Sequence, residues 1–262
     1  MALNLYLDYI NNNCYNDTRP CNNLTYFLKY RLLYSVKNIA ESLELLGQKI
    51  HMAEQQYGRE PGSVKLVAVS KTRPASDILM AASHNQTDFG ENYAQEAISK
   101  ITDIAKPGLI WHFIGPVQSN KTREIAAHFQ WVHSVDRAKI ARRLSDARPE
   151  NMLPLNICIQ INISNEPGKA GIQPSELGAL LDYCSTLPGI RVRGLMALPA
   201  PENEFEKQRI PFRALKKLLD DFNKPGTRYD TLSMGTTHDF EAAIAEGATI
   251  IRIGTAIFGS RS

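Results

Sequence analysis

The sequence of 262 residues contains little cysteine and no long hydrophobic run. The four cysteines, Cys14, Cys21, Cys158 and Cys184, show neither a CxxC redox spacing nor a zinc-ligand spacing, so we expect no metal site. Two of them fall inside predicted apolar elements, which favours reduced structural thiols in a cytoplasmic protein. No segment has the apolar length of a membrane-spanning helix, and the N-terminus lacks the pattern of a secretory signal. We therefore expect no membrane association.

The sequence also has only a small excess of positive over negative charge. Thirty lysines and arginines stand against 27 aspartates and glutamates, which gives a net charge of +3. The basic residues are scattered along the chain, whereas a nucleic-acid-binding protein usually concentrates them in a stripe. We therefore expect no nucleic-acid partner. Hydrophobic residues make up 43% of the chain, which is enough for the core of a globular domain.

Residues 1–33 differ in composition from the rest of the chain. The segment NNNCYNDTRPCNN is rich in asparagine, lacks hydrophobic periodicity and contains few helix formers. We interpret residues 1–33 as an N-terminal extension and predict that it is disordered. An interaction tail is the alternative, which no feature of the segment supports. Residues 34–262 contain no proline- or glycine-rich linker, so we predict a single domain there.

From residue 34 onward, helical patterns alternate with short apolar runs. The first helix is amphipathic, since Ile39, Leu43, Leu46 and Ile50 recur near a 3.6-residue period. The predicted strands are residues 64–70, 86–89, 109–115, 130–134, 155–163, 190–198, 229–234 and 248–254. The clearest helices between them are residues 136–147, 173–187, 211–222 and 238–247. Strict alternation with eight repeats favours an α/β fold, a single (β/α)8 TIM-type barrel; a doubly wound open sheet is the alternative.

Lys71 ends the first predicted strand, VKLVAVSK. In such a barrel, the chemistry lies at the carboxyl ends of the strands. From this strand alone, three roles are open: a solvent-facing lysine, a partner of a neighbouring carboxylate, or an amine that condenses with a carbonyl. The first is the simplest, because lysine is common at such rims.

Arg252 lies inside the apolar run ATIIRIG of the last predicted strand. A guanidinium keeps its proton and is costly to bury without acceptors, so it must meet a carboxylate, a carbonyl or a ligand. Gly254 and Thr255 then open a short helical turn, where backbone amides favour an anion. Ser233 and Gly235 end the preceding strand, and the last two loops of this barrel type commonly bind phosphate. The alternative is that the glycines only end their strands.

Together these features favour a phosphorylated aldehyde as the ligand. Pyridoxal 5′-phosphate (PLP) fits, because Lys71 would form a Schiff base and Arg252 would face the ring nitrogen. A cation at that nitrogen opposes its protonation and weakens the ring as an electron sink. This arrangement suits racemisation, or simply holding the cofactor, better than carbanion chemistry.

The chain resembles the YggS/PROSC family of pyridoxal phosphate homeostasis proteins in five blocks, in order, between about residues 36 and 261. The blocks are LVAVSKTRP, FGENYAQEA, WHFIGPVQSNK, GLMAL and LSMGTTHDFEAAIAEGATIIRIGTAIFGSR. The resemblance implies a PLP-binding barrel similar to the alanine racemase N-terminal domain, with PLP on Lys71, Arg252 against the pyridine nitrogen and Asn92 lining the cofactor. By the same resemblance, the phosphate is held by Ser233, Gly254 and Thr255.

The resemblance has two departures. The family usually shows LSMGMS and an acidic pair, whereas this chain has Thr236, Thr237, His238 and Asp239. Thr237 keeps a hydroxyl where serine is usual, so we expect phosphate binding to survive, and we interpret His238 as solvent-facing. The other departure is the extension of residues 1–33, which the family pattern does not cover.

The implied function is to hold PLP and to act in intracellular PLP homeostasis or delivery, with PLP-dependent apo-enzymes as recipients. No catalytic residue is assigned, because such proteins have no established turnover, and we expect a cytoplasmic monomer. One alternative is a low-activity fold-type III PLP enzyme acting on amino acids, racemase-like or lyase-like. Alanine racemase takes its second base from an additional β-domain, for which we expect no room after Ser262. The other alternative is a barrel that binds a different phosphorylated metabolite.

Other ionisable residues near the predicted strands receive simpler interpretations. We interpret His112 and His133 as hydrogen-bonded core histidines rather than catalytic groups. Lys121 and Lys169 follow predicted strands three and five, and we interpret both as solvated rim lysines. Attraction of phosphate, or a second ligand site, is the alternative for these two lysines.

Overall fold

The computed structural model describes the backbone of residues 24–223 and 229–259, with side chains from residue 39 onward. The chain divides into two compact units, residues 1–37 and 38–262, and the strands lie in the second unit. Helix α2 (Leu24–Gln56) begins in the first unit and ends in the second.

The start of helix α2 differs from the predicted boundary of the extension. Residues 24–33 are helical, whereas we expected the whole segment 1–33 to be disordered. The physical reason is that LTYFLKYRLL contains no glycine or proline to separate it from the amphipathic helix that follows. The remainder of the predicted extension, residues 1–23, lies outside the described residues.

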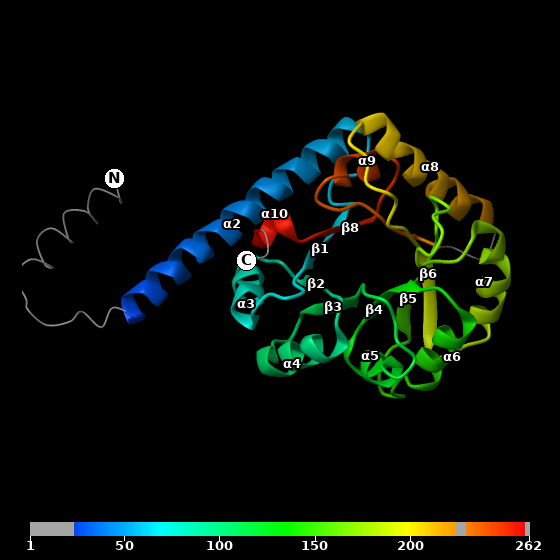
Figure 1. The fold of residues 1–262 in the computed structure, drawn as a ribbon, viewed down its shortest axis with the longest axis horizontal. Coiled ribbons are helices and arrows are strands. Elements are labelled where there is room, and N and C mark those ends of the chain that lie inside the picture. The colour runs from blue at the N-terminus through cyan, green and yellow to red at the C-terminus, as the bar shows by residue number, and fades with distance from the viewer. Residues whose placement is uncertain (1–23, 224–228, 260–262) are drawn as a thin grey trace, which may run out of the picture. The chain divides into compact units, whose positions relative to one another are not determined.

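Eight parallel strands close into a barrel in the order in which they occur along the chain, and β1 pairs with β8 (Figure 1). The predicted (β/α)8 barrel is therefore confirmed, and the open-sheet alternative is wrong. Each predicted strand overlaps an observed one. The strands are β1 (Lys65–Val69), β2 (Asp88–Glu91), β3 (Ile110–Phe113), β4 (Trp131–Val135), β5 (Leu155–Gln160), β6 (Ile190–Met196), β7 (Thr231–Ser233) and β8 (Ile250–Ile253).

Helices follow the strands and lie outside the ring that the strands form (Figure 1). Helix α8 begins at Phe205 rather than at the predicted Pro211, because proline removes one backbone donor without ending a helix whose flanking residues favour it. The helices after α2 are α3 (Ala75–Ser83), α4 (Ala94–Ile104), α5 (Thr122–His128), α6 (Ala138–Asp146), α7 (Leu177–Ser185), α8 (Phe205–Phe222), α9 (Phe240–Ala245) and α10 (Thr255–Phe258), with a 3₁₀ turn η1 (Pro174–Glu176) before α7.

Two apolar clusters follow from the alternation of side chains along each strand. Ala68 and Ile251 point outward and pack in the large cluster between strands and helices. Val67 and Ile250, their neighbours in sequence, belong to a smaller cluster inside the barrel with Trp131, Cys158 and Met196. The small cluster fills only part of the interior, and polar side chains occupy the remainder.

The described cysteines are buried free thiols, as predicted. Burial raises the pKa of Cys158 to about 12 and that of Cys184 to about 11, so both remain protonated and unreactive at neutral pH. Cys14 and Cys21 lie outside the described residues. Over the described part of the chain, no helix has the length and apolar character needed to cross a membrane.

Gly194 in β6 provides a test of the strand packing. A Cβ atom at this position would lie 1.9 Å from the carbonyl oxygen of Thr231, which is backbone and cannot move without disturbing β7. We expect Gly194→Ala to lower the free energy of unfolding by about 3 kcal/mol, the upper end for overpacking. The matched control is Gly47→Ala in α2, where a Cβ meets nothing within 4 Å and should stabilise the helix by about 0.5–1 kcal/mol. Urea denaturation measures both; equal stability of the two variants would contradict this account.

Candidate functional site

The predicted site residues come from four strands that are neighbours in the closed barrel, in the order β7, β8, β1 and β2. All strands are parallel, so their carboxyl ends open at the same end of the barrel. The structure thus places six predicted residues on one contiguous arc of the barrel mouth: Lys71, Asn92, Ser233, Arg252, Gly254 and Thr255.

Lys71 follows β1 and is half-buried. Alternation along β1 directs Val67 inward and Ala68 outward, so the same alternation places Ser70 on the outer side and Lys71 on the inner side. Thr72 has a φ of +63°, a left-handed conformation that threonine rarely adopts. Such a conformation persists only where the surroundings hold it in place.

Contacts outside the barrel hold the residues on both sides of Lys71. Ser70 is buried and donates its hydroxyl to Glu91 Oε1 at 2.6 Å, while its carbonyl accepts from Lys100 Nζ at 2.8 Å. The strained Thr72 donates its backbone N–H to Glu96 Oε1 at 2.6 Å. Together these contacts fix the backbone that carries Lys71.

Lys100 connects these contacts to one another. Its ammonium lies 2.9 Å from Glu91 Oε1 and 2.6 Å from Glu96 Oε1, and it is itself buried. Burial raises the pKa of Glu91, which Lys100 and Ser70 oppose. Among the described residues, two buried oxygens at this strand end lack a hydrogen-bond partner: Oε2 of Glu91 and Oδ1 of Asn92.

Arg252 is buried inside the barrel mouth, and its guanidinium contacts no carboxylate among the described residues. One terminal nitrogen donates to Ser233 Oγ at 2.6 Å, and the other donates to the carbonyl of Ala197 at 3.0 Å. The prediction that Arg252 must meet acceptors is confirmed. Burial lowers the pKa of Arg252 to about 10, so the side chain is still a cation at neutral pH. Because a guanidinium has five N–H donors, donors remain for a ligand.

Ser233 is the start of a hydrogen-bonded chain that continues across the barrel interior. Its Oγ lies 2.6 Å from His133 Nδ1, and His133 Nε2 lies 2.9 Å from His112 Nδ1. His112 Nε2 lies 2.9 Å from Asp88 Oδ1, and Lys65 Nζ lies 2.9 Å from the same oxygen. The prediction of hydrogen-bonded core histidines is therefore confirmed. We call Asp88, His112, His133 and Ser233 the barrel relay.

Electrostatics keep both histidines neutral and Asp88 ionised. Burial lowers the pKa of His112 and His133, and the nearby Arg252 adds to the lowering for His133. For Asp88, burial acts to raise the pKa, but hydrogen bonds from His112, Thr87 and Lys65 outweigh it and lower the pKa to about 2. The relay therefore carries one negative charge at Asp88 and none on its rings.

The environment of Ser233 does not support its predicted role as a phosphate ligand. Arg252 has only donors, so Ser233 Oγ accepts from it. From the other end, ionised Asp88 accepts from His112, so neutral His112 accepts from His133 and neutral His133 accepts the serine hydrogen at Nδ1. Ser233 is also completely buried. A hydroxyl whose one hydrogen is already donated has none to offer a phosphate. Sequence reasoning missed this because it cannot show which strand faces Ser233.

The loops after β7 and β8 place glycines at the barrel mouth. Gly235 has a φ of +95°, and a Cβ there would lie 2.7 Å from Cβ of Ala243, so glycine is required. At Gly254, a Cβ would lie 3.2 Å from the carbonyl of Val69 on neighbouring β1. No acceptor in the described part of the chain receives the N–H of Thr255, at the start of α10. Both glycines therefore allow close backbone packing at the mouth, and the N–H of Thr255 is a donor available to an anion.

The remaining ionisable candidates agree with their simpler interpretations. Lys121 lies 3.1 Å from Glu124, and Lys169 forms an ion pair with Glu166, so each is paired within its own segment. His238 is exposed, as expected. The residues described here contain no cluster of three or more histidine, cysteine or acidic side chains that could hold a metal ion.

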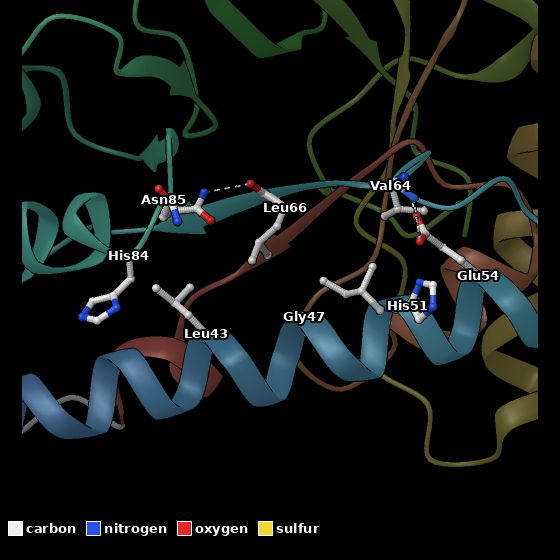
Figure 2. Close-up of a pocket in the computed structure, with 11 residues that line it drawn as sticks. Leu43, Gly47, His51, Glu54, Val64, Leu66, His84 and Asn85 are labelled. Carbon is white, nitrogen blue, oxygen red and sulfur yellow. Dashed lines mark hydrogen bonds between the residues drawn. The ribbon is translucent and has the colours of Figure 1, made fainter.

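A separate pocket of about 390 Å³ lies beside the beginning of β1. Figure 2 shows Leu43, Gly47 and His51 of α2 facing Leu66 and His84 across it. At its edge, Glu54 accepts the backbone N–H groups of Gly62 and Val64, which anchors α2 to the barrel. None of the predicted site residues lines this pocket, so it is not the predicted site.

Sequence reasoning missed Asp88, Glu91, Glu96 and Lys100. Asp88 lies near the end of a predicted strand, and the others lie in or beside the block FGENYAQEA. A polar residue at an inward position of a short apolar strand was the available signal for Asp88. Pairing it with His112 requires the register of β2 against β3, which the sequence does not state.

Comparison with known proteins identifies close relatives. Residues 43–262 match the family model described as alanine racemase, N-terminal domain. The pyridoxal phosphate homeostasis protein of Pseudomonas aeruginosa is 52% identical over 226 residues, 86% of this chain and 97% of that protein. A crystal structure of an unknown protein from Bifidobacterium adolescentis is 31% identical with a TM-score of 0.79, covering 86% of this chain and 96% of that one. PipY of Synechococcus elongatus, whose structure has PLP bound, is 37% identical with a TM-score of 0.74, covering 84% and 100%.

The lowered pKa values of the two relay histidines predict a pH-dependent stability. In the unfolded chain, histidine takes up a proton near its ordinary pKa of 6.5, whereas burial opposes this in the folded protein. The unfolded state then binds more protons, so the free energy of unfolding falls as the pH decreases below about 6.5. The slope has an upper limit of about 1.4 kcal/mol per pH unit for each histidine.

Urea denaturation between pH 7.5 and 5 measures this slope. His133→Gln should reduce it, because one buried titrating ring is removed. The control is His84→Gln, an exposed histidine outside the relay, which should leave the slope as in the wild type. An unchanged slope in His133→Gln would contradict the assignment.

Proposed function

The chain belongs to the family of pyridoxal phosphate homeostasis proteins, whose barrel is the alanine racemase N-terminal domain, and on that premise we propose that it binds PLP at the barrel mouth and acts in PLP homeostasis. The observation that carries the proposal is the buried guanidinium of Arg252. It has donors to spare and hydrogen-bonds to no carboxylate among the described residues, although the charge of Asp239 acts to raise its pKa. It lies on the strand next to the one that precedes Lys71. PipY, a relative of this chain, has a structure with PLP bound.

Bound PLP would supply an aldehyde for covalent attachment, a pyridine nitrogen that accepts a hydrogen bond, and a phosphate dianion. Lys71 would hold this group covalently, because its Nζ is a primary amine that can condense with an aldehyde with loss of one water. The hydrogen bonds of Ser70, Thr72 and Lys100 described above hold the backbone of this lysine in place for the condensation. Preorganisation of this kind lowers the entropic cost of the bond.

Arg252 would donate to the pyridine nitrogen and keep it unprotonated. A ring without that proton is a weaker electron sink, which favours holding the cofactor over reacting it. Asn92 follows β2 on the same arc, and its buried Oδ1 has no partner among the described residues, so it is available to the ligand.

The phosphate would lie against the loops after β7 and β8. Gly254 lets the loop after β8 pack closely on Val69 of β1, and the N–H of Thr255 at the start of α10 is an available donor. Because Ser233 is committed to Arg252 and His133, we assign the phosphate hydroxyl to the half-buried Thr237 instead.

We further propose that PLP-dependent apo-enzymes receive the cofactor and that the protein acts as a monomer in the cytoplasm. The buried free thiols Cys158 and Cys184 support a reducing compartment. A Schiff base forms reversibly with loss of water, which supports release of PLP as well as its capture.

The first test concerns the covalent bond to Lys71. After borohydride reduction of the PLP-loaded protein, we expect mass spectrometry to find the pyridoxyl group on the peptide that contains Lys71. Lys71→Ala should abolish the adduct, because Lys71 is the amine that the end of β1 places at the barrel mouth. The control is Lys121→Ala, a half-buried lysine paired with Glu124, which should retain it. An adduct on a different lysine of the wild-type protein would refute the attachment site.

The second test concerns the phosphate contact of Thr237. We expect Thr237→Ala to weaken PLP binding by about 1.5–3 kcal/mol, the usual contribution of a hydrogen bond to a charged group. Pyridoxal, which lacks the phosphate, should bind the variant and the wild type alike. Thr186→Ala, beyond the end of α7, is the matched control. Fluorescence titration with both ligands measures this, and equal weakening of both would exclude a phosphate contact.

A further inference from the structure

The barrel relay connects Arg252 at the mouth to Asp88 at the start of β2. Its links join side chains of β8, β7, β4, β3 and β2 inside the barrel. We propose that Asp88, His112 and His133 are positioning residues for the cofactor site: acting through Ser233, they hold the guanidinium of Arg252 toward the ligand. This inference rests on the proposed function and extends it to residues that do not touch PLP.

Donor and acceptor accounting gives the relay one direction. The ionised Asp88 can only accept, so neutral His112 donates from Nε2 and accepts at Nδ1, neutral His133 donates from Nε2 and accepts at Nδ1, and the hydrogen of Ser233 goes to His133 Nδ1. A neutral His133 then carries its hydrogen on Nε2 and donates it to His112 Nδ1. His112 in turn carries its hydrogen on Nε2 and donates it to the carboxylate of Asp88. Every link has one hydrogen, and every member is satisfied.

The opposite direction is disfavoured at both ends. If His133 carried its hydrogen on Nδ1, the ring and Arg252 would both donate to Ser233 Oγ, and the serine hydrogen would lose its acceptor. At the other end, His112 would turn an unprotonated Nε2 toward the ionised Asp88, so two acceptors would face each other. The charges of Asp88 and Arg252 therefore favour the same arrangement from opposite ends.

Burial makes this arrangement persistent. His112, His133 and Ser233 are fully buried, so water cannot replace a lost partner. An unpaired buried donor or acceptor carries its full desolvation cost. The hydrogen bond that Asp88 accepts therefore fixes the direction of each following hydrogen bond as far as Ser233. Among the described residues, Ser233 is one of two acceptors that hold Arg252. Ala197, the other acceptor, is a backbone carbonyl and fixed by the fold.

The first measurement needs no cofactor. In the cofactor-free protein near pH 7.5, ¹⁵N NMR shifts of the ring nitrogens should show His112 and His133 as the Nε2–H tautomer. In Asp88→Leu, which removes the acceptor of His112, both tautomers should be populated. Asp88→Asn keeps an oxygen that can accept from His112, so it should restore the wild-type pattern.

The second measurement is the affinity for PLP and for pyridoxal by fluorescence titration. Asp88→Leu should weaken both ligands by the same factor, about fivefold or more, the lower range of coupling between sites. The matched control is Asp230→Leu, a carboxylate at the start of β7 that pairs with Arg193 outside the relay. It should bind both ligands within about twofold of the wild type, well below that coupling.

Ser233→Ala decides the question if Asp88→Leu does not fold. It deletes the acceptor of Arg252 and should weaken PLP and pyridoxal equally, because the phosphate takes no part in the relay. A loss confined to PLP would overturn the proposal and restore Ser233 as a phosphate ligand.

The outcomes separate this inference from the proposed function. Suppose that the wild type binds PLP and that either Asp88→Leu or Ser233→Ala binds PLP and pyridoxal as tightly as the wild type. The relay proposal alone is then wrong. A wild-type His133 with its hydrogen on Nδ1 also overturns it. If the wild type binds no PLP, the proposed function fails, and with it the role of the relay residues.

Discussion

A buried guanidinium that hydrogen-bonds to no carboxylate in the described part of the chain is the constraint on which the interior of this barrel depends. Arg252 keeps its charge and offers only donors, so acceptors must be supplied from the neighbouring strands. The hydroxyl of Ser233 is one of them, and its own hydrogen then needs an acceptor in a fully buried region. His133, His112 and finally the ionised Asp88 meet this need in turn.

The polar relay has an energetic cost that the fold offsets elsewhere. The interiors of such barrels are usually layers of branched apolar side chains. Here the inner apolar cluster around Val67, Trp131 and Ile250 shares the space with the relay. The buried polar groups of the relay are tolerated because each is hydrogen-bonded to the next, and the large outer cluster between strands and helices supplies the apolar burial that stabilises the protein. Departures from an apolar core of this kind are typical of functional sites.

Two polar networks on opposite sides of the strands support Lys71 and Arg252, the two residues that we propose face the cofactor. The relay lies inside the barrel and orients Arg252. The contacts of Lys100 lie outside it and fix the backbone on either side of Lys71, including the strained Thr72. A site built on rigid strands and held by supporting contacts is already in place before its ligand arrives, which lowers the cost of binding. The amine and the guanidinium are therefore positioned independently of each other.

The sequence by itself determined the alternation of strands and helices, the position of Lys71 at a strand end and the need of Arg252 for acceptors. These follow from local periodicity and from the chemistry of single side chains, which a chain carries wherever it folds. Only the tertiary structure decided that Ser233 accepts a hydrogen bond from Arg252 and that the two histidines connect Ser233 to Asp88. It also decided that Lys100 holds the backbone at the end of β1. Each of these depends on strand register and on closure of β8 onto β1, because side chains far apart in sequence meet only when the barrel aligns them.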